Sequence, residues 1–335
     1  MTALLEAKGL KRFYKVGSGR RRGTLHALDG VDIAIGRGES VGLVGESGCG
    51  KSTLARVLAR LVEPSAGSLV FEGEDIGAIP LARFVTNPAR PRIQMVFQDP
   101  TESLNPHLTV ADAIADPLRR LARLSGAALD RRVREAIDMV GLPEALLGRY
   151  PHQLSGGQKA RVGIARAIAV GPELLILDEP TSALDVSVQA VVLKLLADLR
   201  DRLGMSYVFV SHDLDVVRLL CERVVVMYLG EVIETAPAET LFERPAHPYT
   251  RALIAAIPHP ERRGKHPPRL DGSPRSPIDP DPNICQFYGR CPIGQPVCAE
   301  KRPPLRPVGE GHLAACHFAD SKPDTTPAAS GSQGS

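Results

Sequence analysis

The chain has 335 residues, 43 % of them hydrophobic, and carries a formal net charge of +3. This length suits one large α/β domain with a smaller appendage, and so small a charge argues against a nucleic-acid partner. The sequence has no apolar run long enough for a membrane span or an N-terminal signal peptide, so we expect a cytoplasmic protein.

The first predicted elements are strands. Residues 4–16 are predicted to form an edge strand, on which an exposed aromatic ring can stack on the adenine of a nucleotide. We assign this role to Tyr14 rather than to the neighbouring Phe13. Residues 31–35 alternate between large apolar side chains and smaller or polar ones, which predicts a half-buried strand.

A phosphate-binding motif comes next, at residues 45–53. These residues match the pattern GxxxxGK[ST] and consist of Gly45, Glu46, Ser47, Gly48, Cys49, Gly50, Lys51, Ser52 and Thr53. The match follows the apolar run 41–44 and precedes the helix-compatible segment 54–61, which is the context this motif requires. Backbone N–H groups and the helix N-terminus would bind a triphosphate. We expect Lys51 to reach the β- and γ-phosphates and Ser52 to hold Mg²⁺.

A glutamine and a helical insertion follow. Gln98 ends the apolar run 93–97, where its carboxamide can contact both Mg²⁺ and the attacking water, or can simply be a polar strand terminus. Residues 109–150 carry two sets of apolar positions at helical spacing. We therefore expect a helical subdomain over about residues 100–160.

A second anion site is predicted where this insertion ends. A helix is expected over residues 160–169, and its N-terminus would present free N–H groups. Because the phosphate loop already binds the chain's own nucleotide, we expect this second site to contact the γ-phosphate bound by another chain. The motif consists of Leu154, Ser155, Gly156, Gly157 and Gln158.

Two acidic residues follow a strand predicted to be buried on both faces, at residues 174–177. Asp178 would bind Mg²⁺ through its water shell, and Glu179 would polarise the water that attacks the γ-phosphate. A helix cap is the alternative role for this pair. The turn 182–185 follows, and we expect Asp185 to contact a second subunit.

The last predicted strand of the sheet, residues 207–210, leads to His212. Gly45, Gln98, Asp178 and His212 each lie just past an apolar strand. In a doubly wound sheet the carboxyl ends of the strands line one crevice, where ligands bind. We therefore predict that these four motifs form one site.

The C-terminal region differs in composition. Prolines are concentrated after residue 256, so we place the end of the nucleotide domain near residue 255 and expect an irregular extension over 256–320. Cys285, Cys291, Cys298 and Cys316 are enough for one four-cysteine metal site, although their spacing differs from that of zinc ribbons. The four cysteines could bind an iron–sulfur cluster, bind zinc or remain free thiols, and the sequence leaves these three alternatives open. Residues 321–335 are polar and predicted to be disordered.

With these residues in place, the chain resembles the ATP-binding subunit of an ABC transporter. The resemblance implies an α/β P-loop cassette over residues 1–255, with a RecA-like parallel sheet core, an antiparallel β subdomain and the helical insertion. It implies ATP and Mg²⁺ as ligands and a catalytic set of Glu179, Gln98 (the Q-loop) and His212 (the switch histidine). Residues 154–158 would be the signature, which acts in trans, and residues 182–185 the D-loop.

A narrower resemblance is to the di- and oligopeptide importer branch, which includes nickel importers. It rests on residues 103–106 (SLNP), 183–189 (ALDVSVQ) and 247–253 (HPYTRAL) and on the C-terminal cysteines. It implies a [4Fe-4S] cluster at the cysteines, a non-identical second ATPase, two membrane permeases and an extracytoplasmic solute-binding protein. The protein would then act at the cytoplasmic face of the inner membrane. Residues 159–161 (KAR) depart from the usual arginine-glutamine-arginine, and import of nickel or another small solute, or export, remains an alternative.

Overall fold

The fold is built on two β-sheets. The computed structural model describes residues 3–17, 22–257 and 272–319. Its larger sheet contains five parallel strands and an antiparallel region at one end. The spatial order is β11 (Arg306–Gly309), β12 (His312–Ala314), β10 (Glu231–Pro237), β9 (Arg223–Tyr228), β3 (Ser40–Val44), β8 (Ser206–Val210), β7 (Leu174–Asp178) and β6 (Ile93–Val96).

The central parallel strands of the large sheet have continuous apolar sequences. Every residue of β3, β7 and β8 is buried, because helices or strands cover both faces of the sheet, and continuous apolar runs are what this environment requires. The predicted strands at 41–44, 93–97, 174–177 and 207–210 are all confirmed, within a residue at their ends.

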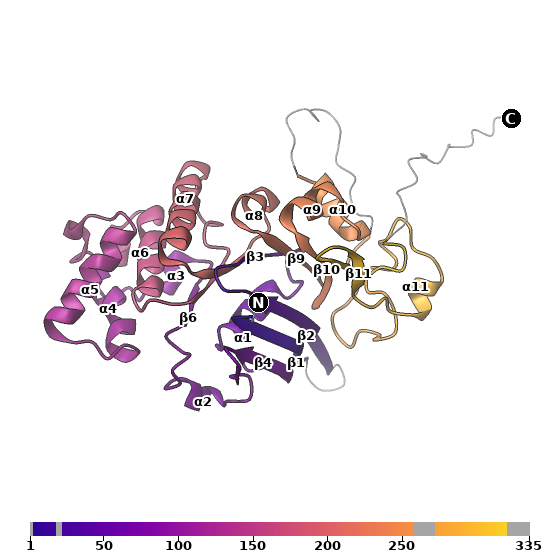
Figure 1. Ribbon diagram of the computed structural model, residues 1–335, viewed down its shortest axis with the longest axis horizontal. Helices are drawn as coiled ribbons and strands as arrows, with labels where there is room; N and C mark the ends of the chain where they lie inside the picture. Colours follow the sequence, from indigo (N-terminus) through magenta and orange to yellow (C-terminus); the bar gives the residue numbers. More distant parts are fainter. Residues whose placement is uncertain (1–2, 18–21, 258–271, 320–335) are drawn as a thin grey trace.

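The smaller sheet is antiparallel, in the order β2 (Gly23–Ile35), β1 (Leu5–Val16), β4 (Ala66–Phe71) and β5 (Glu74–Asp75). Residues 31–35 show the predicted alternation of buried and exposed side chains. The prediction that β1 is an edge strand is wrong, because β2 pairs with one side of it and β4 with the other. Helix α1 (Lys51–Leu58) contacts β7 and β8 of the large sheet and β2 of the small one, so it lies between the two sheets (Figure 1).

The helical insertion lies beyond β6. It contains α3 (Pro100–Ser103), α4 (Val110–Arg120), α5 (Gly126–Met139) and α6 (Gly156–Ile168). The apolar positions of α4 are buried, and the Thr109 side chain caps its N-terminus by accepting a hydrogen bond from the Asp112 N–H. Helices therefore occupy much of residues 100–160, where we expected a helical subdomain, and α6 leads back toward the sheet.

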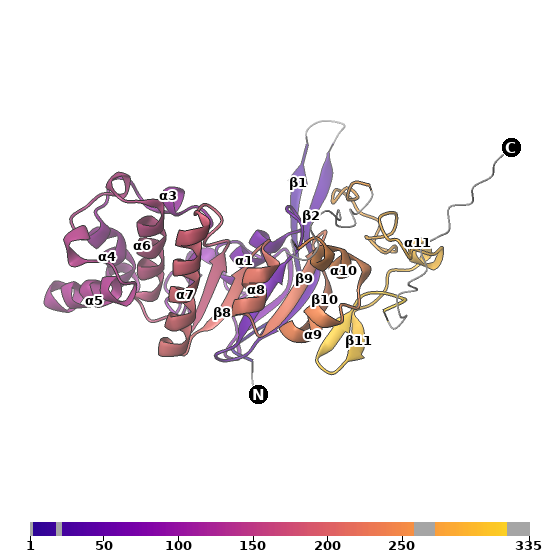
Figure 2. The same cartoon turned by 90° about the horizontal axis from the view of Figure 1, so that it is seen from above.

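The remaining helices lie in several parts of the molecule. Their bounds are α2 (Leu81–Phe84), α7 (Val186–Leu203), α8 (Leu214–Leu220), α9 (Ala238–Glu243), α10 (Pro248–Ala255) and α11 (Val297–Glu300). The insertion and the C-terminal extension lie at opposite ends of the molecule, as Figure 1 and Figure 2 both show. No helix in the described ranges is long and apolar enough to cross a membrane.

The C-terminal extension is more regular than its prolines suggest. We expected irregular structure, but β11 and β12 form a hairpin, and β12 pairs with β10 so that the main sheet continues into the extension. Pro307 fits because it lies on β11, the strand at the end of the sheet. The predicted disordered tail, residues 321–335, falls outside the described residues.

Candidate active site

The phosphate loop connects β3 to α1. Gly45 has φ 150° and Gly50 has φ 105°, in a region that favours glycine. A Cβ at Gly45 would lie 2.3 Å from the Met227 carbonyl oxygen, and one at Gly50 would lie 2.4 Å from that of Ala27. The loop therefore packs so closely against β2 and β9 that both positions require glycine.

The Lys51 side chain extends from the start of α1 into this loop. It is buried, and its Nζ donates to the carbonyl oxygens of Gly45 at 2.7 Å and Glu46 at 3.0 Å. These contacts hold the ammonium group inside the concavity of the loop. Ser47 and Gly48 are exposed at its rim, so this arrangement provides a positive charge and open main chain for a polyphosphate.

Two oxygen ligands suitable for Mg²⁺ meet beside the loop. The Ser52 hydroxyl donates to Asp178 Oδ1 at 2.9 Å, and hard divalent cations prefer such oxygen ligands. Asp178 is only 1 % exposed. Burial raises the pKa of this carboxyl, and the hydrogen bond from Ser52 partly opposes the shift. A bound cation would favour the ionised form still further.

Three strand ends meet at Glu179. Its Oε2 accepts a hydrogen bond from Gln98 Nε2 at 3.2 Å and lies 3.2 Å from His212 Nδ1. These residues follow β6, β7 and β8, so the predicted convergence at one edge of the sheet is present. Gln98 contacts Glu179 rather than the Ser52–Asp178 pair. The carboxylate is 15 % exposed and the imidazole 65 % exposed, so the group opens toward solvent.

The backbone of Glu179 is unusual. Its φ is 46°, a left-handed conformation that is uncommon for a non-glycine residue. Its N–H donates to the Val210 carbonyl oxygen at 3.0 Å, which extends the β7–β8 pairing by one residue. This pairing places the Glu179 side chain between the ends of β6 and β8.

The signature segment begins helix α6. Ser155 is the N-cap and accepts from the Gln158 N–H, while Gln158 Oε1 accepts from the Ser155 N–H at 2.9 Å. This capping box defines the helix N-terminus. Ser155 and Gly156 are exposed. Among the described residues, no hydrogen bond or ion pair links this segment to the phosphate loop, so the two predicted anion sites of one chain stay separate.

The turn after Glu179 leads into α7. Asp185 is the N-cap of α7 and accepts from the Val188 N–H at 3.0 Å and the Ser187 hydroxyl at 2.7 Å. These hydrogen bonds lower the pKa of Asp185. A Cβ at Gly157 would lie 2.5 Å from a Val188 methyl group. The glycine therefore allows α6 and α7 to approach closely, which places Asp185 near the signature.

The two aromatic candidates for adenine stacking have different neighbours. The Phe13 ring packs on His26 with a centroid distance of 4.1 Å. The Tyr14 ring lies 4.5 Å from the Arg12 guanidinium and remains partly exposed. This arrangement is compatible with the choice of Tyr14, whose role remains a prediction.

Two contacts to the phosphate loop escaped the sequence reasoning. The Glu46 N–H donates to Tyr249 Oη at 2.7 Å, and the Glu46 carboxylate forms an ion pair with Arg290. Tyr249 belongs to the segment 247–253, which we noted only as a family motif. Arg290 has no local signal, because 244 residues separate it from its partner.

The four C-terminal cysteines are all described. The Cys285 N–H donates to the Cys298 carbonyl oxygen at 2.9 Å. Burial raises the pKa of Cys285, and that of Cys291 to about 11, and the neighbouring thiols add to both shifts. The thiols thus share one region. Even so, among the residues that the structure describes, no group of three or more His, Cys, Asp or Glu side chains is placed to hold a metal ion. The predicted metal site is therefore not supported by this arrangement.

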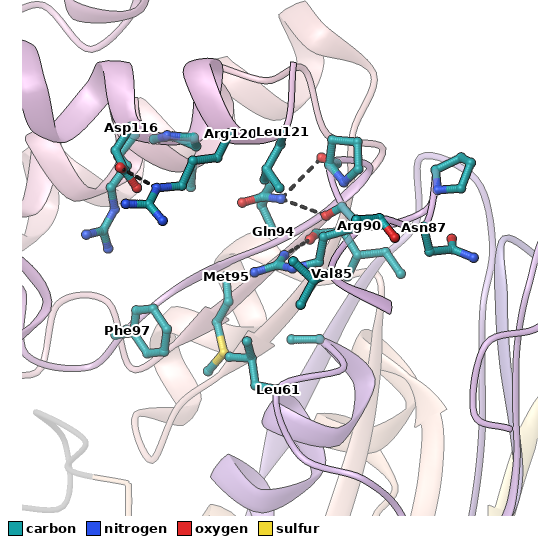
Figure 3. Close-up of a pocket in the computed structure, with 18 of the residues that line it drawn as sticks. Leu61, Val85, Asn87, Arg90, Gln94, Met95, Phe97, Asp116, Arg120 and Leu121 are labelled. Atoms are coloured by element: carbon teal, nitrogen blue, oxygen red, sulfur yellow. Dashed lines mark hydrogen bonds and ion pairs between the residues drawn. The ribbon is translucent and has the colours of Figure 1, made fainter. Parts of the chain in front are cut away.

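A groove lies between the sheet and the helical insertion (Figure 3). Its volume is about 640 Å³. Apolar side chains from Leu61, Met95 and Phe97 line one part of it, and Arg90 and Arg120 line another. Phe97, which lines this groove, is the residue directly before Gln98, which contacts Glu179.

Comparisons with protein families match two parts of the chain. Residues 28–182 match the family described as ABC transporter, and residues 233–298 match the oligopeptide/dipeptide transporter C-terminal region. The second match begins within β10, so it spans the junction between the cassette and the extension.

Several known proteins are similar along most of their length. An oligopeptide transport ATP-binding protein of Bacillus subtilis, AppF, is 42 % identical, covering 94 % of this chain and 97 % of that protein. A putative peptide import ATP-binding protein of Brucella ovis is 45 % identical, covering 94 % and 98 %. Among solved structures, the dimeric ATP-binding cassette MJ0796 with ADP and Pi is 32 % identical. It has a TM-score of 0.63 and covers 70 % of this chain and 98 % of that one.

Proposed function

The chain belongs to the ABC transporter family, as an ATP-binding protein of the peptide-transport branch, and on this premise we propose how it works. It is the ATP-hydrolysing motor subunit of an importer that takes up di- or oligopeptides. The observation that carries the proposal is the contact of one Glu179 carboxylate oxygen with both Gln98 and His212, beside an intact phosphate loop.

The nucleotide site uses main chain and charge. Residues 45–53 bind the triphosphate, with Lys51 at its β- and γ-phosphates, and Tyr14 stacks on the adenine. Ser52 and Asp178 would hold Mg²⁺, with Gln98 as a further candidate ligand. When bound, Mg²⁺ neutralises phosphate charge.

Glu179 is the proposed general base. It accepts a proton from water as the water oxygen attacks the γ-phosphorus, and the bond from that phosphorus to the oxygen of the ADP leaving group breaks. Gln98 and His212 orient the carboxylate and the water. The three side chains follow adjacent strands of one sheet, and the pairing of these strands brings them together.

Each ATP-binding site is completed by residues of a second subunit. Ser155 and the exposed N-terminus of α6 contact the γ-phosphate held by the partner's phosphate loop. Asp185 contacts that partner. This proposal is supported by the exposure of Ser155 and Asp185 and by the separation of the signature from its own phosphate loop. Binding of two ATP molecules then closes the dimer and hydrolysis opens it.

The groove of Figure 3 is the proposed permease site. Its apolar part fits the apolar face of a helix, while Arg90 and the ion pair of Arg120 with Asp116 lie in its lining. Because Phe97 lines the groove and Gln98 contacts Glu179, movement of a docked helix is linked to the catalytic carboxylate. We propose two permease subunits, one docking on each ATPase.

The full system follows from the family branch. We propose a non-identical second ATPase, an extracytoplasmic solute-binding protein, and a position at the cytoplasmic face of the inner membrane through the permeases. We keep a [4Fe-4S] cluster at Cys285, Cys291, Cys298 and Cys316 as a proposal, with zinc as the alternative. The test is iron and sulfide content of anaerobically purified protein; their absence removes the cluster.

The decisive test is uptake of labelled di- and oligopeptides by the native host. We expect a chromosomal Glu179→Gln variant to lose uptake, while Glu222→Gln, at an exposed carboxylate outside the crevice, keeps it. Unchanged peptide uptake in Glu179→Gln would overturn the peptide cargo. Nickel uptake measured in the same strains then tests the second candidate, and retention of labelled substrates tests export.

A further inference from the structure

The C-terminal extension reaches into the nucleotide site. Arg290 Nη1 and Nη2 lie 2.9 Å and 3.0 Å from the two carboxylate oxygens of Glu46, the second residue of the phosphate loop. This is a bidentate ion pair, the strongest geometry available to arginine and carboxylate. The Arg290 side chain is 8 % exposed and that of Glu46 33 %.

Arg290 is held by aromatic residues of the cassette. Its Nη1 also donates to Tyr228 Oη at 3.2 Å, and Tyr228 packs edge-on against Tyr249 with a centroid distance of 4.8 Å. Phe287 from the extension contacts both tyrosine rings. The hydrogen bonds to Glu46 and Tyr228 raise the pKa of Arg290, so its guanidinium stays charged.

The same aromatic cluster also holds the phosphate-loop main chain. Tyr249 Oη accepts the Glu46 N–H at 2.7 Å, while the Glu46 carbonyl oxygen accepts from Lys51 Nζ. Glu46 is thus bound through its N–H, its carbonyl oxygen and its carboxylate. The loop residue next to Gly45 therefore has little freedom to move while Arg290 is in place.

The charge of the Arg290–Glu46 ion pair affects how the loop binds phosphates. A carboxylate beside a polyphosphate repels it, and inside a partly buried site this repulsion is weakly screened. Arg290 neutralises Glu46. Without the arginine, the phosphate loop would keep an unpaired negative charge at its second residue.

We propose that Arg290 is a positioning residue of the ATP site, which completes the phosphate loop from the C-terminal extension by neutralising and holding Glu46. The proposal rests on the ATP-binding function assigned above. It gives the extension a role in nucleotide affinity, in addition to its packing against the cassette.

The test is ATP affinity of the purified full chain, measured with Mg²⁺ by displacement of a fluorescent ATP analogue. We expect Arg290→Met to raise the Kd for ATP about tenfold, a change of about 1.4 kcal/mol. The matched control is Arg302→Met, which removes another arginine of the extension whose partner is a cassette carboxylate, Glu231, that does not belong to the phosphate loop. Its Kd should equal that of the wild type.

A double-mutant cycle separates this role from general packing. Glu46→Gln removes the charge that Arg290 neutralises, so adding Arg290→Met to Glu46→Gln should change the Kd less than about threefold. Equal effects of Arg290→Met in both backgrounds would overturn the proposal, as would a wild-type Kd in a folded Arg290→Met protein. Should Arg290→Met fail to fold, Arg290→Lys keeps the charge but loses the bidentate contact, and we expect an increase of about threefold against none in the control.

The two proposals fail differently. If the wild-type chain does not bind ATP, the assignment of the phosphate loop is wrong and this inference falls with it. If the wild type binds ATP and the Arg290 variants match it, only the role of Arg290 is overturned.

Discussion

The nucleotide crevice and the junction with the C-terminal extension are built in opposite ways. In the crevice, Gln98 and His212 are exposed and each makes one contact of 3.2 Å to Glu179. At the junction, Glu234 on β10 is fully buried and accepts from the N–H groups of Ala246 and His247 and pairs with His312 at 2.7 Å.

This difference separates residues that act on a ligand from residues that hold the chain together. Polar groups left open at a strand end are available to substrate and to a partner subunit. Buried polar groups satisfied by their own chain stabilise it, and removing one leaves its partners unpaired. We therefore expect changes in the crevice to affect turnover and changes at the junction to affect stability, with Arg290 as the exception that spans both.

The largest expected effect is on turnover. Glu179→Gln should lower ATP hydrolysis by about 10²- to 10⁴-fold, because the base that activates water is lost. The free energy of unfolding and the Kd for ATP should stay close to wild type. Steady-state phosphate release by the assembled transporter is the measurement, with Glu222→Gln as the control. Undiminished hydrolysis would show that the crevice does not work as assigned.

A substitution at the junction should instead lower the free energy of unfolding. Glu234→Ala removes a buried carboxylate and leaves two backbone N–H groups and His312 without their acceptor, at a cost of roughly 3 kcal/mol. Denaturant unfolding measures this. Glu243→Ala, at an exposed position of α9, should change the free energy of unfolding by less than about 0.5 kcal/mol. Equal values for the two variants would mean that the extension is only loosely attached.

A smaller effect should depend on pH. Burial raises the pKa of Glu231 from 4.5 to about 7, and the nearby Arg302 only partly opposes the shift. A carboxyl with a raised folded-state pKa binds its proton more tightly when folded, so its contribution to stability falls as pH rises from about 4.5 to 7 and stays low above that range.

Glu231→Gln removes this pH dependence. We expect the variant to be on the order of 2 kcal/mol more stable than wild type at pH 8, with little difference at pH 4.5. Loss of the ion pair with Arg302 reduces the gain. Unfolding curves at both pH values measure it, with Glu243→Gln as an exposed control. A constant offset between Glu231→Gln and wild type at both pH values would contradict the assignment of this shift to Glu231.

Much of the crevice was predictable from the sequence. The phosphate loop is a contiguous motif between a strand and a helix, so its local sequence specifies both its shape and its chemistry. Gln98, Glu179 and His212 are far apart in the chain, but each follows a continuous apolar run. Since parallel strands place their carboxyl ends along one edge, the sequence also predicts that these residues meet.

The remaining features depended on which segments pair across long separations. The apolar and aromatic side chains of residues 4–16 predicted an edge strand, but only the positions of β2 and β4 show that this strand is internal. Short-range signals also missed the β11–β12 hairpin, because its pairing with β10 is decided by the path of the whole chain. The arrangement of the cysteines and the contact between Arg290 and Glu46 could not be predicted for the same reason. In both cases the tertiary fold brings together side chains from distant segments, and the local sequence around one residue does not indicate its partner.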